Sequence, residues 1–305
     1  MTDAPANPRS IAAWLARGGM LALGLLCASM GTARADDAAP ALHAKYRALQ
    51  DALGHNPFGK PIHLDSGETS KGVSGDIHAV VDHSFTKVSE ALATADHWCD
   101  ILILHVNTKY CRASTPRQGT VLDVSIGKKH DQPLEQAYRV VFTYRVLSQV
   151  SDHLQVALTA DEGPLGTRNY RIVLDAVPLA DGRTFTHLSY SYTYGVVGRL
   201  AMRVYLGTVA KDKVGFTITG AGTDGRPVYI DGMRGLVERN TMRYYLAIEA
   251  FLDAVSSPPQ AQLEKRLRAW FAATERFPRQ LHEVDERAYL EMKRKEYRRQ
   301  QVAAP

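Results

Sequence analysis

The widest apolar stripe in the chain lies in residues 236–255. Mostly apolar positions recur there at steps of three and four: Val237, Thr241, Tyr244, Tyr245, Ile248, Phe251, Leu252 and Val255. Charged residues such as Glu238 and Asp253 take the opposite side, so the pattern predicts an amphipathic helix. Pro258 and Pro259 end it, because proline cannot continue the backbone hydrogen-bond ladder.

Alternating apolar and polar positions predict a series of strands before this helix. The strands are expected at residues 76–84, 104–112, 120–128, 137–150, 153–160, 169–178, 183–194, 214–219 and 228–230. Turn chemistry such as Asp181-Gly182 makes successive strands hairpins. A helical pattern over residues 196–208 is predicted to interrupt the sheet just before its last strands. A curved antiparallel sheet is the expected partner of the long helix.

Helical spacing also marks both ends of the chain. The segments are residues 36–53, 85–98 with a second short turn to Ile103, 262–277 and 283–301, and a short strand is expected at 62–64. The last two helices are charged and have narrow apolar stripes, so they either wrap the core or pair with a partner. The basic residues between 293 and 299 are interpreted as a solvated helix face rather than a lipid-binding patch.

The first 35 residues predict a cleaved export signal. Arg9 and Arg17 precede an apolar run over residues 20–30, and Ala33-Arg34-Ala35 is a small-x-small cleavage pattern. The run is shorter than the roughly 20 residues that span a bilayer, so the mature chain is expected to begin near Asp36 and to be periplasmic or secreted.

The cysteines and the charge refine this picture. Cleavage leaves Cys99 and Cys111, and an oxidising compartment favours one disulfide between them, with two buried free thiols as the alternative. The leader contains three arginines and one aspartate, so the formal charge of +5 falls to +3 in the mature chain. A balance this even argues against a dedicated nucleic-acid surface.

Residues 75–111, GDIHAVVDHSFTKVSEALATADHWCDILILHVNTKYC, resemble the opening of the START-like superfamily, also called the polyketide-cyclase or Bet v 1-like superfamily. Residues 79–82 match its first strand, Phe85, Val88 and Leu92 its helix face, and Trp98 the tryptophan that closes the helix. The resemblance covers about residues 75–255. It implies an α+β helix-grip fold, in which a curved antiparallel sheet wraps around a long C-terminal helix, here with extra C-terminal helices.

The expected organisation is a signal peptide over residues 1–35, an N-terminal helix and loop over 36–74, a START-like domain over 75–257 and a helical extension over 258–305. The resemblance further implies a deep apolar cavity that carries lipids, sterols or polyketides. The candidate lining residues are Phe142, Tyr144, Tyr190, Tyr192, Tyr245 and Ile248. Arg199 is the candidate partner of an acidic headgroup, because its planar guanidinium binds such groups in two places.

No catalytic signature stands out, so we expect a binding or carrier protein with no catalytic residues. A cyclase, aromatase or hydrolase with His153 or His187 as acid or base is the alternative. A second alternative is an envelope scaffold that acts through its C-terminal helices. No cofactor or metal is expected: the GAGTDG string at residues 220–225 leads into a strand rather than a helix, and His78, Asp82 and His83 do not converge.

Overall fold

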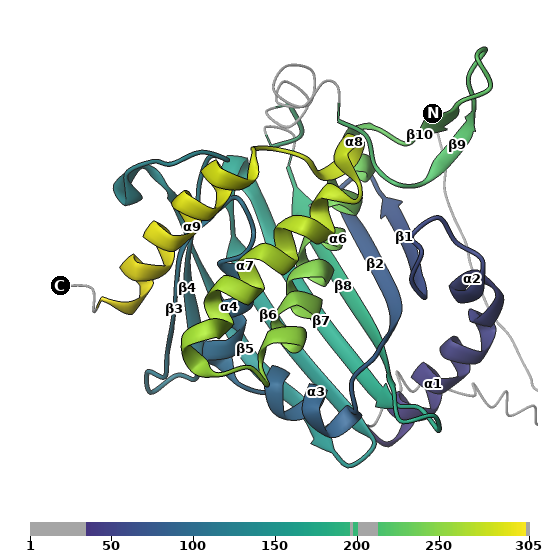
Figure 1. Cartoon of the computed structure of the whole chain (residues 1–305), viewed down its shortest axis with the longest axis horizontal. Coiled ribbons are helices and arrows are strands. Elements are labelled where there is room, and N and C mark those ends of the chain that lie inside the picture. The colour runs from purple at the N-terminus through teal and green to yellow at the C-terminus, as the bar shows by residue number, and fades with distance from the viewer. Residues whose placement is uncertain (1–34, 196–197, 201–212, 303–305) are drawn as a thin grey trace, which may run out of the picture. The chain divides into compact units, whose positions relative to one another are not determined.

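The computed structural model describes residues 35–195, 198–200 and 213–302, which form an α+β fold (Figure 1). Within these residues, eight antiparallel strands make one curved sheet in the order β1-β2-β8-β7-β6-β5-β4-β3. The strands are β1 (Ile62–Glu68), β2 (Gly72–Val81), β3 (Thr108–Ser114), β4 (Val121–Ile126), β5 (Tyr138–Val150), β6 (His153–Glu162), β7 (Thr167–Pro178) and β8 (Thr184–Tyr194). Strands β2 to β8 correspond to predicted segments, and β1 extends the short strand predicted over residues 62–64 and lies at the edge of the sheet.

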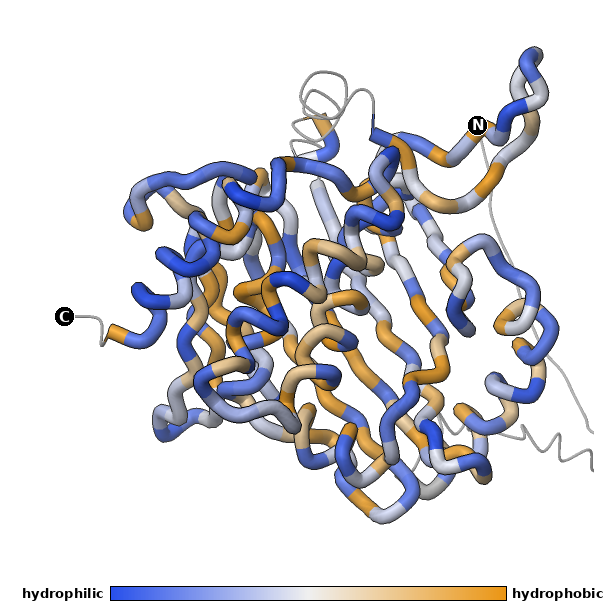
Figure 2. Tube along the Cα trace, in the orientation of Figure 1, coloured by the Kyte–Doolittle hydropathy of each residue, from blue (hydrophilic) through white to orange (hydrophobic). Residues whose placement is uncertain are grey.

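The long helix α6 (Gly232–Ala254) crosses one face of this sheet (Figure 1). It begins four residues earlier than predicted, after Asp231, and it ends before the two prolines. Figure 2 shows apolar residues along both α6 and the central strands beneath it. Two charged residues predicted for a solvated side, Glu238 and Arg243, are buried, because other segments cover the outer side of the helix. The predicted helix-grip arrangement of sheet and helix is therefore confirmed, with a helix that is buried on both sides.

One predicted pair of strands does not join the main sheet. Strands β9 (Ile218–Ala221) and β10 (Pro227–Tyr229) form a separate hairpin. The reason lies in Glu238 on α6, whose Oε2 accepts hydrogen bonds from the backbone N–H groups of Phe216 (2.6 Å) and Thr217 (2.9 Å). This carboxylate ties the segment before β9 to the helix rather than to a sheet edge.

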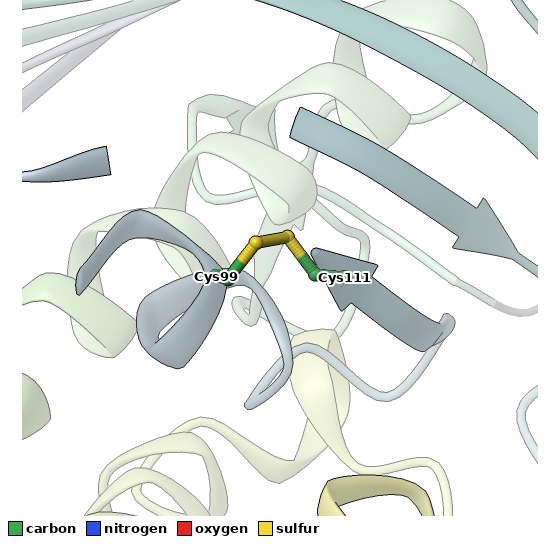
Figure 3. Close-up of a disulfide and its surroundings, with 2 residues drawn as sticks. All are labelled: Cys99 and Cys111. Atoms are coloured by element: carbon green, nitrogen blue, oxygen red, sulfur yellow. A yellow bond between two sulfur atoms is a disulfide. The ribbon is translucent and has the colours of Figure 1, made fainter. Parts of the chain in front are cut away.

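A disulfide joins the two short helices to the sheet. The predicted helix over residues 85–98 is divided into α3 (Phe85–Leu92) and α4 (Ala95–Leu102), and the Trp98 indole N–H donates to the Leu92 carbonyl at 2.7 Å across the break. Cys99 on α4 is bonded to Cys111 on β3, with 5.1 Å between their Cα atoms (Figure 3). The predicted disulfide is therefore present.

The opposite face of the sheet carries the N-terminal helices α1 (Ala35–Ala48) and α2 (Gln50–Gly54). Leu42 and Leu53 pack there with Val177 and Phe185 in a small apolar cluster. The docking helix predicted over residues 36–53 is thus confirmed as two helices. We call this side the back face, and the side beneath α6 the inner face.

The C-terminal helices are α7 (Pro259–Glu275), α8 (Pro278–Leu281) and α9 (Glu286–Gln301). Leu267 and Trp270 of α7 and Tyr289 of α9 belong to the main core. Both helices therefore wrap the core, which is one of the two arrangements predicted for them. The prediction of a wholly solvated basic run is wrong for Lys293, which is fully buried.

Two further predictions fall on other parts of the chain. The signal peptide, and most of the helix expected over residues 196–208, lie outside the described residues, although residues 198–200 are helical. None of the helices in the described ranges is both long and apolar enough to cross a membrane.

Candidate functional site

A cavity of about 150 Å³ lies between the inner face of the sheet and α6. Its walls come from the turn before β3, from strands β3, β4, β5, β7 and β8, and from the first turns of α6. The lining residues are His105, Asn107, Thr108, Ile126, Phe142, Pro164, Leu165, Thr167, Tyr170, Tyr190, Tyr192, Leu236, Asn240 and Tyr244. The wall is therefore mainly aromatic, with a few polar groups among the rings.

Four tyrosines form the most extensive part of this wall. Strand alternation places Tyr190 and Tyr192 of β8 on the inner face, and their ring centroids lie 6.3 and 5.2 Å from that of Tyr170 on β7. Tyr244 of α6 meets Tyr190 edge-on, with 5.3 Å between centroids. Burial raises the pKa of Tyr170 to about 12 and also raises the pKa of the other three phenols, so all four stay protonated at neutral pH.

His105 lies at the opposite end of the wall, in the turn between α4 and β3. Its side chain is buried, and its ring centroid is 5.1 Å from that of Tyr244. The ring Nδ1 accepts a hydrogen bond from the backbone N–H of Asn107 at 3.2 Å. The ring Nε2 is buried and has no hydrogen-bond partner among the described residues. Among the described residues that line the cavity, it is the one fully buried side-chain nitrogen or oxygen without a partner.

The rim is formed by the turn that precedes β7. Leu165 of this turn is exposed, although it lines the cavity. Gly198 packs against the same turn, where a Cβ atom would lie 3.1 Å from the Gly166 carbonyl oxygen. The chain after β8 therefore passes close to the rim, where a side chain would press on the backbone of this turn.

Three of the six predicted lining residues, Phe142, Tyr190 and Tyr192, line this cavity. The other three, and the predicted headgroup partner Arg199, are not among its lining residues. The hydroxyl of Tyr144 donates to the Leu92 carbonyl at 3.3 Å, that of Tyr245 donates to Glu249 at 2.9 Å, and Ile248 is buried in the core. The guanidinium of Arg199 lies over the Tyr194 ring, 5.6 Å from its centroid.

The lining residues that sequence reasoning missed include His105, Tyr170, Asn240 and Tyr244. The helical members had a signal. Leu236, Asn240 and Tyr244 follow one another at steps of four, so they share one side of α6, and a polar asparagine within an apolar stripe marks a side that faces something other than packed core. His105 had no such signal, because its orientation depends on the turn that carries it.

The histidines considered as acids or bases lie on the back face. The rings of His78 on β2 and His187 on β8 stack with 4.3 Å between centroids, and His187 Nε2 is 2.9 Å from Asp76 Oδ1. Burial lowers the pKa of His78 to about 3, with a further contribution from His187. His153 Nε2 lies 3.4 Å from Asp175. His153 and His187 are therefore on the side of the sheet away from the cavity, and neither is among its lining residues.

No group of three or more histidine, cysteine or carboxylate side chains within the described ranges has the geometry to hold a metal ion. The residues 220–225 that match a dinucleotide motif span the end of β9 and the turn that leads to β10. The motif therefore does not open a helix, which a dinucleotide site of that type requires.

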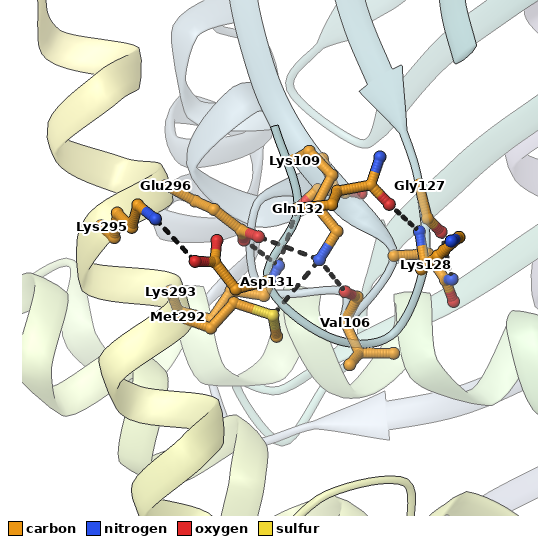
Figure 4. A network of polar contacts seen from close by, with 12 residues as sticks. Val106, Lys109, Gly127, Lys128, Asp131, Gln132, Met292, Lys293, Lys295 and Glu296 are labelled. Atoms are coloured by element: carbon orange, nitrogen blue, oxygen red, sulfur yellow. Dashed lines mark hydrogen bonds and ion pairs between the residues drawn. The ribbon is translucent and has the colours of Figure 1, made fainter. Parts of the chain in front are cut away.

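A second polar assembly, which we call the lysine pair, lies behind His105. Lys109 of β3 and Lys293 of α9 are fully buried and share the carboxylate of Glu296, at 2.9 and 2.7 Å (Figure 4). Lys293 also donates to the carbonyls of His105 and Thr108, each at 2.7 Å. Burial lowers the pKa of Lys293 to about 8, and Glu296 opposes this shift. The C-terminal helix therefore holds the turn on which His105 sits.

No family model matches the chain, and no curated protein does. Several solved structures are similar to it, and three of them are described here. Truncated norcoclaurine synthase from Thalictrum flavum is 17% identical over 47% of this chain and 91% of its own, with a TM-score of 0.31. A START superfamily protein from Mycobacterium smegmatis is 13% identical over 47% and 93%, with a TM-score of 0.30. Human StAR-related lipid transfer protein 5 is 12% identical over 58% and 90%, with a TM-score of 0.31.

The fold assignment rests on the elements of this chain. The segment from β2 to α6 runs through one strand, two short helices, six more strands of the same sheet and the long helix. That is the order expected from the START-like resemblance, and the described chain has the α+β helix-grip fold.

Proposed function

We propose that the protein is an exported carrier that holds a small hydrophobic, polyketide-like ring compound between the sheet and α6 without changing it. The observation that carries the proposal is the cavity between the inner face and α6, whose wall contains Phe142 and four tyrosines. Small-molecule sites are commonly concave and apolar, with a few polar groups that orient the ligand. Asn107, Thr108 and Asn240 are polar residues of this wall.

The volume favours a single ring over a lipid. An engineered cavity of about this size in another protein binds one benzene molecule, whereas sites for drug-sized ligands span roughly 300–1,000 Å³. An acyl chain or a sterol would need the cavity of about 150 Å³ to widen. A monocyclic compound with small substituents fits it as it stands.

The electrostatics of the wall favour carriage over catalysis. General acid–base catalysis works best with groups whose pKa lies near the working pH. Burial lowers the pKa of His105 well below its ordinary value, with Arg243 and Lys293 adding to the effect, and it raises the pKa of the four phenols. In the cyclase or hydrolase alternative, one of these groups would have to exchange a proton at a pH far from its pKa.

The C-terminal helices give little support to the scaffold alternative. Their large apolar residues, Trp270, Tyr289 and Met292, are buried in the chain's own core. Little apolar surface of α9 is then left for a partner. Export is supported by the leader pattern of residues 1–35 together with the Cys99–Cys111 bridge, since disulfides persist in oxidising compartments.

Native mass spectrometry of the protein purified from its own periplasm tests the proposal. We expect a co-purifying compound of one ring's mass, lost in Leu236→Phe, which adds volume to the cavity wall. Leu263→Phe is the matched control, because Leu263 lies on α7 and does not line the cavity. A wild-type protein that carries nothing and binds no small aromatic compound would refute carriage, and turnover of a bound compound would favour the enzyme.

A further inference from the structure

The charge of the cavity wall restricts what the cavity can hold. Among the described residues that line it, none is a lysine, an arginine or a carboxylate. The titratable members are His105 and the four tyrosines, and burial keeps all five neutral at neutral pH. A charge that enters an apolar site is costly unless a counter-charge meets it there. A charged ligand would therefore need a counter-charge from behind the wall.

The nearest cations behind the wall already have anionic partners. Arg243 of α6 donates to the wall residue Asn240 at 3.4 Å, but its guanidinium lies 2.6 Å from the carboxylate of Glu283. Lys293, behind His105, lies 2.7 Å from Glu296. The same two carboxylates pair with the other cations of this region, Lys129 at 2.7 Å and Lys109 at 2.9 Å. An anion in the cavity would have to compete with carboxylates that are in place.

The phenols of the wall show whether burial or the nearby cations dominate. Burial raises the pKa of Tyr244, and the charge of the adjacent Arg243 only partly opposes the shift. Burial likewise raises the pKa of Tyr192 against the opposing charge of Arg239. For Tyr170 the pKa rises to about 12. Desolvation thus outweighs the cations for the wall's own phenols, and a hydroxylated ring among them meets the same surroundings.

We propose that the cavity accepts its ligand only in the uncharged form, so that a weakly acidic ring compound of the phenol class binds as the neutral acid and leaves as the anion. The inference rests on the proposed function, since it names the class and charge of the ligand of the same cavity. Binding is then coupled to ionisation. Above the pKa of the free ligand, each bound molecule takes up one proton, and its affinity falls about tenfold per pH unit.

The probe pair is 2,6-difluorophenol and 1,3-difluorobenzene, because they share a fluorinated ring and only the phenol ionises, close to neutral pH. Their affinities for the protein are measured by ¹⁹F NMR titration between about pH 5 and about pH 9. We expect the dissociation constant of the phenol to be constant at acid pH and to rise about tenfold per pH unit once the phenol ionises. That of difluorobenzene should stay constant. Since the pKa of Lys293 is about 8, the neutral probe also reports any effect of the protein's own titration.

Proton uptake supplies a second measurement on the wild-type protein. Calorimetric titrations in buffers of different ionisation enthalpy should show about one proton taken up per phenol bound at alkaline pH, and none for difluorobenzene. Leu236→Phe, which narrows the cavity, should weaken both probes, and the control Leu263→Phe should weaken neither.

The outcomes separate this inference from the carrier proposal. A phenol that binds equally well after it ionises, or that takes up no proton, would overturn the inference and leave carriage intact. Failure of both probes to bind wild type, or binding that Leu236→Phe does not weaken, would overturn the two proposals together.

Discussion

Two polar assemblies lie on opposite sides of the turn over residues 104–108, and they differ in how their polar groups are satisfied. In the lysine pair, Lys109 and Lys293 each have three acceptors, and Glu296 receives a hydrogen bond on each oxygen. In the cavity, His105 Nε2 has no acceptor within the described chain. Closed networks rigidify a fold, whereas an open one leaves a place for another molecule. The closed assembly here holds the open one in position.

We expect the largest loss of stability from removing the charge of Glu296, the carboxylate that the lysine pair shares. Glu296→Gln leaves two buried ammonium groups without a counter-charge, and removing one partner of a buried ion pair costs about 3–5 kcal/mol. Urea denaturation followed by circular dichroism measures the change in the free energy of unfolding. Glu291→Gln, an exposed position on the same helix, is the control and should stay within about 0.5 kcal/mol. A loss below about 1 kcal/mol for Glu296→Gln would show that the lysine pair does not hold α9.

The disulfide also constrains the turn over residues 104–108, because it joins α4 to β3 on either side of the turn. Replacing both Cys99 and Cys111 by alanine opens a loop with a sequence separation of 12. The expected loss is about 3 kcal/mol, mainly through the entropy of the unfolded chain. Thermal unfolding of oxidised wild type, reduced wild type and the double variant measures it. Reduced protein as stable as oxidised protein would contradict the prediction.

Acid should destabilise the fold through its buried neutral histidines, His78 on the back face and His105 beside the cavity. The pKa of His78 is about 3 in the folded protein against an ordinary value of 6.5, so between these values the unfolded state binds more protons. The free energy of unfolding therefore falls as pH falls from about 6.5 towards 3, by up to about 1.4 kcal/mol per pH unit. Urea titrations at several pH values measure the slope. His78→Gln should flatten the slope, and an unchanged slope would assign the acid sensitivity to other groups.

The sequence predicted the architecture better than the site. Alternation and turn residues located strands β2 to β8, because each hairpin has a local signal, and the Pro258-Pro259 pair located the end of α6. The prediction that β9 joins the main sheet was wrong. The segment before β9 is held by Glu238, which lies 17 positions beyond the end of the strand at Ala221. The local sequence pattern also could not predict how α6 is rotated about its own axis. Tyr244 lines the cavity and Tyr245 does not, although both belong to the wide stripe.

These adjacent tyrosines give the smallest and most direct test of the contrast between closed and open polar groups. The Tyr245 hydroxyl donates to Glu249 at 2.9 Å, whereas the Tyr244 hydroxyl forms no hydrogen bond that the described residues account for. Tyr245→Phe should cost about 1–1.5 kcal/mol of unfolding free energy, the value of a hydrogen bond to a charged group. Tyr244→Phe removes the same atom from the same helix and should cost less than about 0.5 kcal/mol. Equal losses in urea denaturation would mean that the Tyr244 hydroxyl is also satisfied within the protein, because removing a hydroxyl that forms no hydrogen bond costs little.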